Sequence, residues 1–101
     1  MKRIAFDLDG TLTIQANIDF LDCNFYEREK QYKKMLPNKK MIKLINQLYR
    51  EGNIVFIVTS RHLEHKKTTE YWLKKNKIKY YYAIYDKPYY DRIYDDKALT
   101  P

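Results

Sequence analysis

An α/β fold with a small parallel sheet is what this sequence predicts, on the basis of three observations. Short apolar stretches typical of strands occur at residues 3–8, 54–58 and 80–84. Between them lie segments with helical spacing of apolar residues, at 39–50 and 63–76. Polar clusters follow the apolar stretches directly. Because strands and helices alternate, we expect parallel strands with right-handed crossovers and the polar clusters at one edge of the sheet.

Local signals support the main elements in turn. Asn38 is the expected N-cap of the helix at 39–50, and Gly52 is placed to end that helix in a left-handed conformation. The run Ile54–Val58 is continuously apolar and rich in β-branched residues. Such a run is typical of a central strand covered by helices on both faces, which predicts three layers. Trp72, in the second helix, is expected in the core.

Other segments give weaker signals. Residues 11–36 are polar and aromatic with weak periodicity, so we expect a loop or flap there, with no more than a helical turn at 26–35. After the third strand, residues 85–88 are expected to turn. Residues 92–94 then predict a short fourth strand that ends at an acidic pair.

Length, charge and cysteine content narrow the class of protein. The chain has 101 residues and a formal net charge of +7, which predicts one domain and favours anionic partners, from phosphorylated metabolites to nucleic acid. A single cysteine, Cys23, excludes an internal disulfide and fits a reducing cytoplasm. No run approaches the roughly 20 apolar residues needed to span a bilayer. Since the first strand begins at residue 3, we expect no signal peptide and a cytoplasmic protein without membrane contact.

Two carboxylates follow the first apolar stretch. Asp7 and Asp9 are one residue apart, so their side chains share a side if the chain stays extended. Crowded carboxylates repel each other unless a cation or a shared proton holds them. Mg²⁺ accepts one or two carboxylates together with water and phosphate oxygens. Gly10 follows where the chain must turn sharply, because it lacks a Cβ. The pair therefore indicates a magnesium site.

The stretch Asp7–Leu12 resembles the first motif of the haloacid dehalogenase-like (HAD) superfamily, whose members are mostly magnesium-dependent phosphohydrolases. Thr59, at the end of the second strand, resembles the second motif. Lys87 and the pair Asp95–Asp96 are similar to the third and fourth motifs, in the family order and spacing. The end of the chain resembles small members associated with bacterial capsule and surface-polysaccharide synthesis.

The resemblance implies a role for each matching residue. Asp7 would be the nucleophile that forms an aspartyl-phosphate, and Asp9 would be the general acid and then the general base. Thr59 and the backbone amide of Ser60 would bind phosphoryl oxygens. Lys87 would offset negative charge on the phosphoryl group and on the nucleophile. Each of these residues alone would be read as a turn, cap or surface residue, so the inference rests on the combination.

Magnesium is the cofactor that the resemblance implies. Its ligands would be the side chain of Asp7, the backbone carbonyl of Asp9 and the carboxylate of Asp95, with Asp96 assisting directly or through water. Phosphoryl transfer depends mainly on positioning and on charge neutralisation, which a divalent ion and one lysine can supply.

Three further polar residues follow the second strand. Arg61 is a candidate substrate-binding residue, although a salt bridge explains it as well. His62 and His65 lack the cysteine or histidine companions of a zinc site, so they are interpreted as surface residues. His62 is also a candidate substrate contact.

The resemblance also implies the architecture. We expect one HAD-like domain over residues 1–101, a Rossmann-like core with strand order 4-1-2-3 and an insertion at about 11–36, but no cap domain. The site would then be open. An open site suits a bulky substrate, or small substrates if a neighbouring subunit of a homo-oligomer forms the lid.

Three functions remain open from the sequence. The leading hypothesis is a magnesium-dependent phosphatase that acts on a sugar phosphate or related metabolite, in surface-polysaccharide synthesis for example. The alternatives are a polynucleotide 3′-phosphatase, favoured by the charge and the open site, and a non-catalytic module that binds phosphorylated ligands. A receiver domain also has acidic residues, a lysine and a threonine on a parallel sheet, but its nucleophile lies on a later strand.

Overall fold

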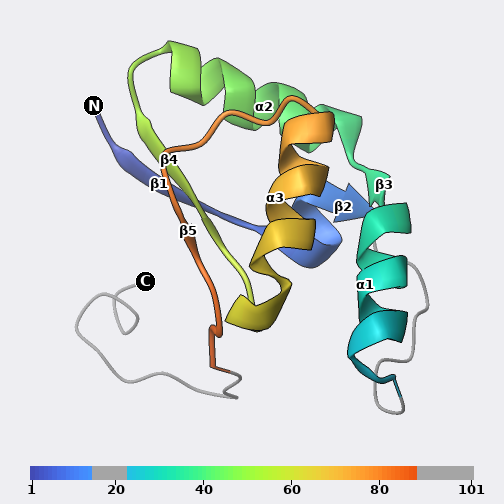
Figure 1. Ribbon diagram of the computed structural model, residues 1–101. Helices are drawn as coiled ribbons and strands as arrows, with labels where there is room; N and C mark the ends of the chain where they lie inside the picture. The colour runs from blue at the N-terminus through green and yellow to red at the C-terminus, as the bar shows by residue number, and fades with distance from the viewer. Residues whose placement is uncertain (15–22, 89–101) are drawn as a thin grey trace.

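The computed structural model describes residues 1–14 and 23–88. Its main sheet has three parallel strands, in the spatial order β1 (Arg3–Asp7), β4 (Ile54–Val58) and β5 (Ala83–Ile84) (Figure 1). The helices are α1 (Phe25–Lys34), α2 (Lys39–Arg50) and α3 (Lys66–Lys75). The observed order agrees with the predicted order of the first three strands. The predicted fourth strand, at 92–94, lies outside the described residues.

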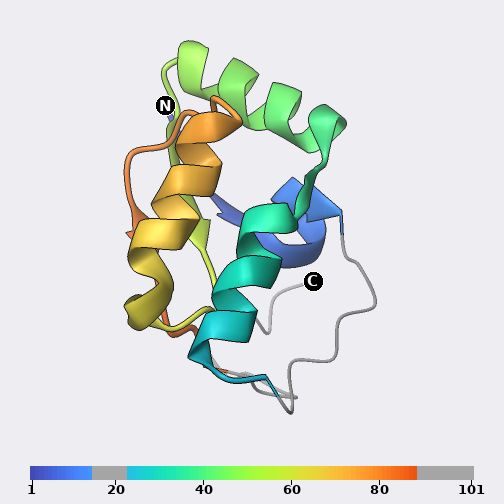
Figure 2. The same cartoon turned by 45° about the vertical axis from the view of Figure 1, so that its right-hand side comes forward.

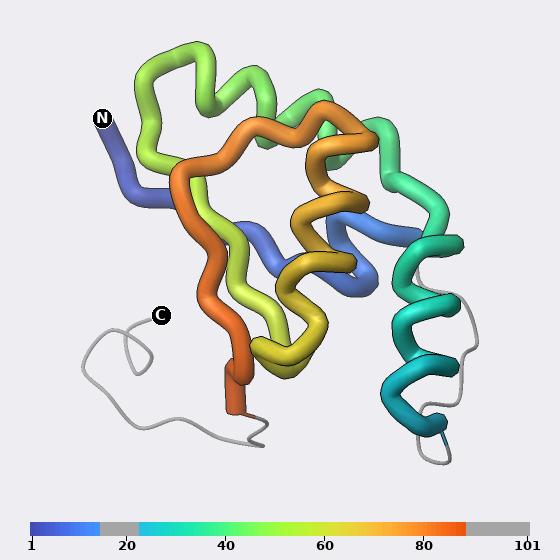
Figure 3. The backbone as a smooth tube through the Cα atoms, in the orientation of Figure 1, coloured from blue at the N-terminus to red at the C-terminus, as the bar shows by residue number. Residues whose placement is uncertain are grey.

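The three strands come from distant parts of the chain, yet they are neighbours in space (Figure 3): β1 pairs with the whole of β4, and β5 pairs with the last two residues of β4. Val55 and Ile57 on β4 are fully buried, and so is Ile45 on α2. Phe6 on β1 and Trp72 on α3 belong to the same core, at 5% and 2% exposed. Trp72 is therefore a core residue, as predicted. Its indole nitrogen donates a hydrogen bond of 2.8 Å to the backbone carbonyl of Met35.

Helices α2 and α3 lie on the same face of the sheet (Figures 1 and 2). The opposite face carries Ala5, Tyr82 and Ile84, which are exposed, and Phe56, which stacks on the Tyr82 ring. The third layer that the sequence predicts is therefore absent from the described part of the chain. The reason is topological. Two right-handed crossovers that step in the same direction along a sheet place both helices on one face.

The predicted ends of α2 are confirmed. The side-chain oxygen of Asn38 accepts a hydrogen bond from the backbone N–H of Met41, at 3.3 Å. At the other end, Gly52 has φ +91°, the left-handed conformation that ends a helix without a Cβ clash. The apolar stripe and its capping residues were sufficient to place this helix.

The segment at 11–36, expected to be a loop or flap, has more structure than the sequence indicates. Helix α1 takes up ten of its residues, and the side chain of Asn24 caps it by accepting from the N–H of Glu27 at 2.9 Å. Strands β2 (Thr13–Ile14) and β3 (Leu36–Pro37) form a small antiparallel pair. Only Tyr32 of α1 is buried, so the helix lacks the apolar periodicity by which it could be predicted.

Two other boundaries differ from the sequence expectation. The second predicted helix begins as a short 3₁₀ turn, Leu63–His65, before α3. The third strand is reduced to two paired residues, although Tyr81 N–H still donates to Val55 O at 2.9 Å. Within the described residues, no helix has the length and apolar character needed to cross a membrane.

Candidate active site

The site begins where β1 ends. Directly after Asp7 the chain enters a tight turn, Leu8–Leu12, in which Gly10 has φ +84°. The two leucines at its ends are fully buried and hold the turn against the core. Thr13 Oγ1 accepts a hydrogen bond from the Gly10 N–H at 3.2 Å. This turn leaves the Asp7 and Asp9 side chains partly exposed, at 50% and 36%.

The end of β4 supplies Thr59 and Ser60. Thr59 is 1% exposed, and its backbone N–H donates to Ile84 O on β5 at 2.9 Å. Its hydroxyl oxygen accepts a hydrogen bond from the Arg61 N–H at 3.1 Å. Since a hydroxyl also carries a proton, Thr59 can still donate to a ligand oxygen. Ser60, half-buried, follows it directly.

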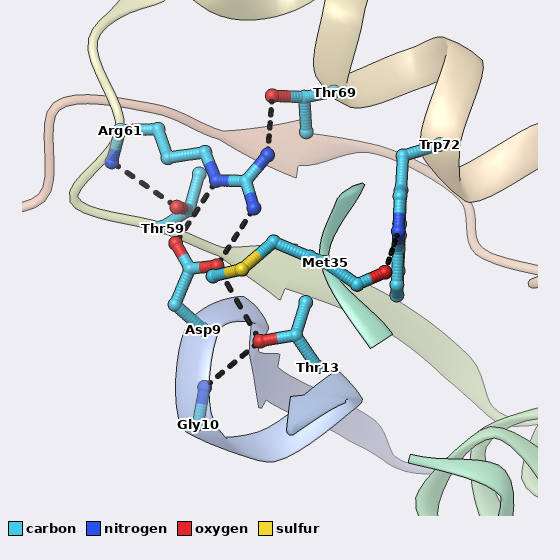
Figure 4. A network of polar contacts seen from close by, with 8 residues as sticks. All are labelled: Asp9, Gly10, Thr13, Met35, Thr59, Arg61, Thr69 and Trp72. Atoms are coloured by element: carbon cyan, nitrogen blue, oxygen red, sulfur yellow. Dashed lines mark hydrogen bonds and ion pairs between the residues drawn. The ribbon is translucent and has the colours of Figure 1, made fainter. Parts of the chain in front are cut away.

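Arg61 contacts Asp9, Thr59 and Thr69 through hydrogen bonds (Figure 4). Its Nε and Nη2 donate to the two carboxylate oxygens of Asp9, at 2.9 and 2.7 Å. Its Nη1 donates to Thr69 Oγ1 at 3.1 Å, and the guanidinium lies 3.8 Å from the centre of the Tyr32 ring. The sequence left two roles open for Arg61, a salt bridge and substrate binding. Arg61 is 3% exposed and makes the salt bridge.

The end of β5 supplies Lys87, as the sequence predicts. Its ammonium nitrogen lies 3.8 Å from Asp7 Oδ2, and the two side chains are 35% and 50% exposed. Its backbone N–H donates to Thr59 O at 3.0 Å, which ties this segment to the end of β4. An exposed ion pair of this kind contributes about 1 kcal/mol or less to stability. Because both side chains are partly exposed, the carboxylate and the ammonium group stay accessible to a ligand.

Two ionisable groups near the site have perturbed pKa values. Burial raises the pKa of Tyr85 to about 12, and the nearby Glu70 charge adds to the effect. A hydrogen bond with His62 lowers the pKa of Asp86, and the backbone N–H of Leu63 lowers it further. Tyr85 therefore stays protonated at neutral pH and is no candidate base, whereas Asp86 is a carboxylate.

The two histidines differ in their exposure to solvent. His62 is 59% exposed, as predicted. The prediction for His65 was wrong, because this residue is fully buried. Its ring stacks on Phe25 with 4.7 Å between ring centres and meets Tyr32 edge-on at 5.1 Å. Both aromatic residues come from α1, a helix that the sequence pattern hardly indicates.

The donor chemistry at this edge suits magnesium only in part. Asp7 offers a partly exposed carboxylate, and oxygen is the ligand atom that Mg²⁺ prefers. The Asp9 carboxylate oxygens accept from Arg61, so the backbone carbonyl of Asp9 is left for the ligand role that the HAD resemblance implies. Residues 1–14 and 23–88 contain no group of three or more His, Cys, Asp or Glu side chains placed to hold a metal. Asp95 and Asp96, the other predicted ligands, lie outside the described residues.

Some residues of this site carry no sequence signal. Thr69 and Tyr32 contact Arg61 from α3 and α1, and nothing in their sequence neighbourhood marks them. Thr13 lies four residues after Asp9, and its Oγ1 is 3.5 Å from Asp9 Oδ1. Its position just past the acidic turn is the one available hint.

The fold is shared with known structures. A protein from Vibrio cholerae matches with 27% sequence identity and a TM-score of 0.66, over 95% of this chain and 80% of the Vibrio chain. A chain in a structure of the Pnkp1/Rnl/Hen1 complex matches with 22% identity and a TM-score of 0.67, over 96% of this chain and 31% of that one. A structure of the Pnkp1/Rnl/Hen1 RNA repair complex gives 23% identity and a TM-score of 0.69, over 83% and 25%.

The comparisons with family models and with curated proteins found no match. No protein-family model matches the chain, and no curated protein is significantly similar to it. The chain spans about a third or less of the two matched chains from the RNA repair complex. What the structural matches establish is the α/β fold alone.

Proposed function

We propose that this protein is a HAD-like phosphatase, which hydrolyses phosphomonoesters through an aspartyl-phosphate on Asp7. The observation that carries the proposal is the Lys87 ammonium group, 3.8 Å from the Asp7 carboxylate. These residues are far apart in the sequence, and each matches a different motif of the HAD resemblance. Thr59 lies between them in the chain, and its backbone carbonyl accepts from the Lys87 N–H. The fold of the matched structures is compatible with this activity.

In the first step, an oxygen of the Asp7 carboxylate forms a bond to phosphorus. The bond from phosphorus to the substrate alcohol oxygen breaks, and its electron pair stays on that oxygen. Asp9 enters this step with a proton on one carboxylate oxygen and donates it to the leaving oxygen, which leaves Asp9 as the carboxylate that Arg61 binds. Each carboxylate oxygen of Asp9 has two lone pairs. Arg61 donates to one lone pair on each oxygen, so the second lone pair can carry the proton.

In the second step, water attacks the phosphorus and Asp9 takes the proton of that water. The bond between Asp7 and phosphorus breaks, which releases phosphate and restores the carboxylate. Lys87 and the Thr59 hydroxyl stabilise the negative charge of the phosphoryl group throughout. A bound Mg²⁺, held by Asp7, the backbone carbonyl of Asp9 and Asp95 with Asp96, would supply further charge neutralisation.

Asp7→Asn tests the proposal directly. Asparagine has almost the same shape but cannot form the acyl phosphate, so release of phosphate from p-nitrophenyl phosphate with Mg²⁺ should fall by about 10³-fold or more. The matched control is Glu51→Gln, which neutralises an exposed carboxylate at the end of α2 and should leave the rate unchanged. Equal rates for Asp7→Asn and the wild type would exclude Asp7 as the nucleophile.

A polynucleotide 3′-phosphatase is the second candidate. Two matched chains belong to the Pnkp1/Rnl/Hen1 complex, one of whose structures is described as an RNA repair complex. In addition, a surface pocket between α1 and α3 is lined by Lys33, Lys67, Thr68 and Tyr71. Lysines bind backbone phosphates and an exposed tyrosine ring can stack on a base, so this lining suits a nucleic acid strand. A sugar phosphate or related metabolite stays the leading substrate class from the sequence.

A further inference from the structure

Asp86 has a backbone conformation that is uncommon outside glycine. Its φ is +58°, in the left-handed region that residues with a Cβ rarely adopt. Among the described residues, one other non-glycine residue has positive φ, Lys77 at +56°. Lys77 lies just past the end of α3, where a left-handed residue commonly ends a helix. Asp86 ends no helix, so its conformation needs another explanation.

The contacts of Asp86 supply that explanation. Its backbone N–H donates to Arg61 O at 2.9 Å. Its Oδ1 lies 2.7 Å from His62 Nδ1, and its Oδ2 accepts a hydrogen bond from the Leu63 N–H at 3.2 Å. All three partners belong to the segment that follows β4. Asp86, which follows β5, therefore contacts three consecutive residues that follow β4.

This set of contacts lies next to the catalytic lysine in the chain. Lys87 follows Asp86 directly, its backbone N–H donates to Thr59 O at 3.0 Å, and its side chain reaches Asp7. The lysine side chain is long and only half-buried, so its ammonium group is fixed mainly through its backbone. A shift of that backbone by about 1 Å is sufficient to lower a catalytic rate strongly.

We propose that Asp86 is a positioning residue, whose carboxylate clamps the Lys87 backbone to the segment after β4 and keeps the ammonium group beside Asp7. His62 is the second half of this clamp. The catalytic consequence rests on the proposed phosphatase function, whereas the clamp itself does not. The lowered pKa of Asp86 agrees with a carboxylate that accepts two hydrogen bonds.

The decisive variant is Asp86→Gly. Glycine adopts φ +58° without strain, so the substitution removes the carboxylate contacts and leaves the backbone conformation allowed. We expect kcat for phosphomonoester hydrolysis to fall by about tenfold, with KM changed by less than about twofold. Asp86→Asn, which keeps an acceptor for the Leu63 N–H, should recover part of the loss. Lys77→Gly is the matched control, since it relieves the same backbone strain outside the clamp and should keep the wild-type kcat.

Amide hydrogen exchange, measured by NMR, provides a readout that does not require activity. In Asp86→Gly and in His62→Ala, the amides of Lys87 and Leu63 should exchange faster than in the wild type, and in Lys77→Gly they should not. His62 is exposed, so its truncation tests the clamp even if Asp86→Gly fails to fold.

The two readouts separate the possible failures. A wild-type protein that hydrolyses no phosphomonoester would refute the proposed function, and faster exchange at Lys87 in the variants would still support the clamp. Unchanged exchange at Lys87 in both variants would overturn the clamp. An active enzyme in which Asp86→Gly keeps the wild-type kcat would overturn the positioning role, while the phosphatase function would stand.

Discussion

At the scale of single residues, the contact between Arg61 and Asp9 is the most specific feature of the site. Both carboxylate oxygens of Asp9 accept from the guanidinium, which is itself held by Thr69 and by the ring of Tyr32. A bidentate contact fixes the plane of the carboxylate, which a single hydrogen bond would leave free to rotate. In the proposed reaction this orients Asp9 towards the leaving oxygen.

Arg61→Lys tests this orientation. Lysine keeps the positive charge but loses the planar fork, so Asp9 should remain paired and lose its fixed plane. We expect kcat to fall by about 10- to 100-fold while KM stays close to the wild-type value. Steady-state kinetics with a phosphomonoester measure both quantities.

The KM in that experiment distinguishes the two roles that the sequence left open for Arg61. A rise in KM without a loss of kcat would indicate direct substrate binding and contradict the internal role. Arg50→Lys, an exposed arginine at the end of α2, is the control for the substitution itself and should change neither constant.

At the scale of elements, the site depends on how the segments before and after the strands are fixed. Helix α2 illustrates this. Its N-cap, Asn38, accepts from Met41 N–H through its side chain and donates its own N–H to Leu12 O at 2.8 Å. The start of the helix is thus tied to the turn that carries Asp9 and Gly10.

Asn38→Ala should therefore destabilise the fold. Removing a side-chain cap costs about 1 kcal/mol in the free energy of unfolding, because one backbone N–H loses its partner. Urea denaturation measures this change. Asn38→Ser, which keeps a capping oxygen, should retain most of the stability. If the alanine and serine variants unfold at the same urea concentration, the side chain of Asn38 contributes nothing as a cap.

At the scale of the whole molecule, the net charge of +7 bears on the substrate class. Each phosphate of a single strand neutralised by a lysine contributes about −0.7 to the slope of log affinity against log salt concentration. A metabolite with one phosphoryl group makes few such contacts. A polynucleotide bound in the pocket between α1 and α3 would also contact Lys33 and Lys67.

The leading hypothesis predicts a shallow dependence on salt. We expect kcat/KM for a sugar phosphate to change by about twofold or less between 50 and 200 mM NaCl, at constant Mg²⁺. The same measurement on a 3′-phosphorylated oligonucleotide is the comparison. A higher kcat/KM for the oligonucleotide, with a steep salt dependence that Lys33→Gln and Lys67→Gln reduce, would favour the polynucleotide 3′-phosphatase instead.

The sequence predicted the parts of this protein that depend on local pattern. The apolar runs of β1 and β4 and the capped stripe of α2 are local signals, and each was placed close to its observed position. Because parallel strands bring their carboxyl ends to one edge, the alternation of strands and helices also predicted that Asp7 and Lys87 could converge there, and the HAD resemblance implied that Lys87 acts on Asp7. That edge is where they lie, 3.8 Å apart.

Tertiary structure alone decided the rest. The contact of Arg61 with Asp9 joins residues 52 positions apart, and His65 is buried because α1 packs aromatic rings against it. Helix α1 buries one of its own residues, Tyr32, so it has no apolar stripe by which the sequence could indicate it. Such contacts leave no period or spacing in the sequence, because each partner is chosen by the folded chain and not by its neighbours. The sequence by itself thus determined which groups reach the edge of the sheet, and the folded chain determined how they are held there.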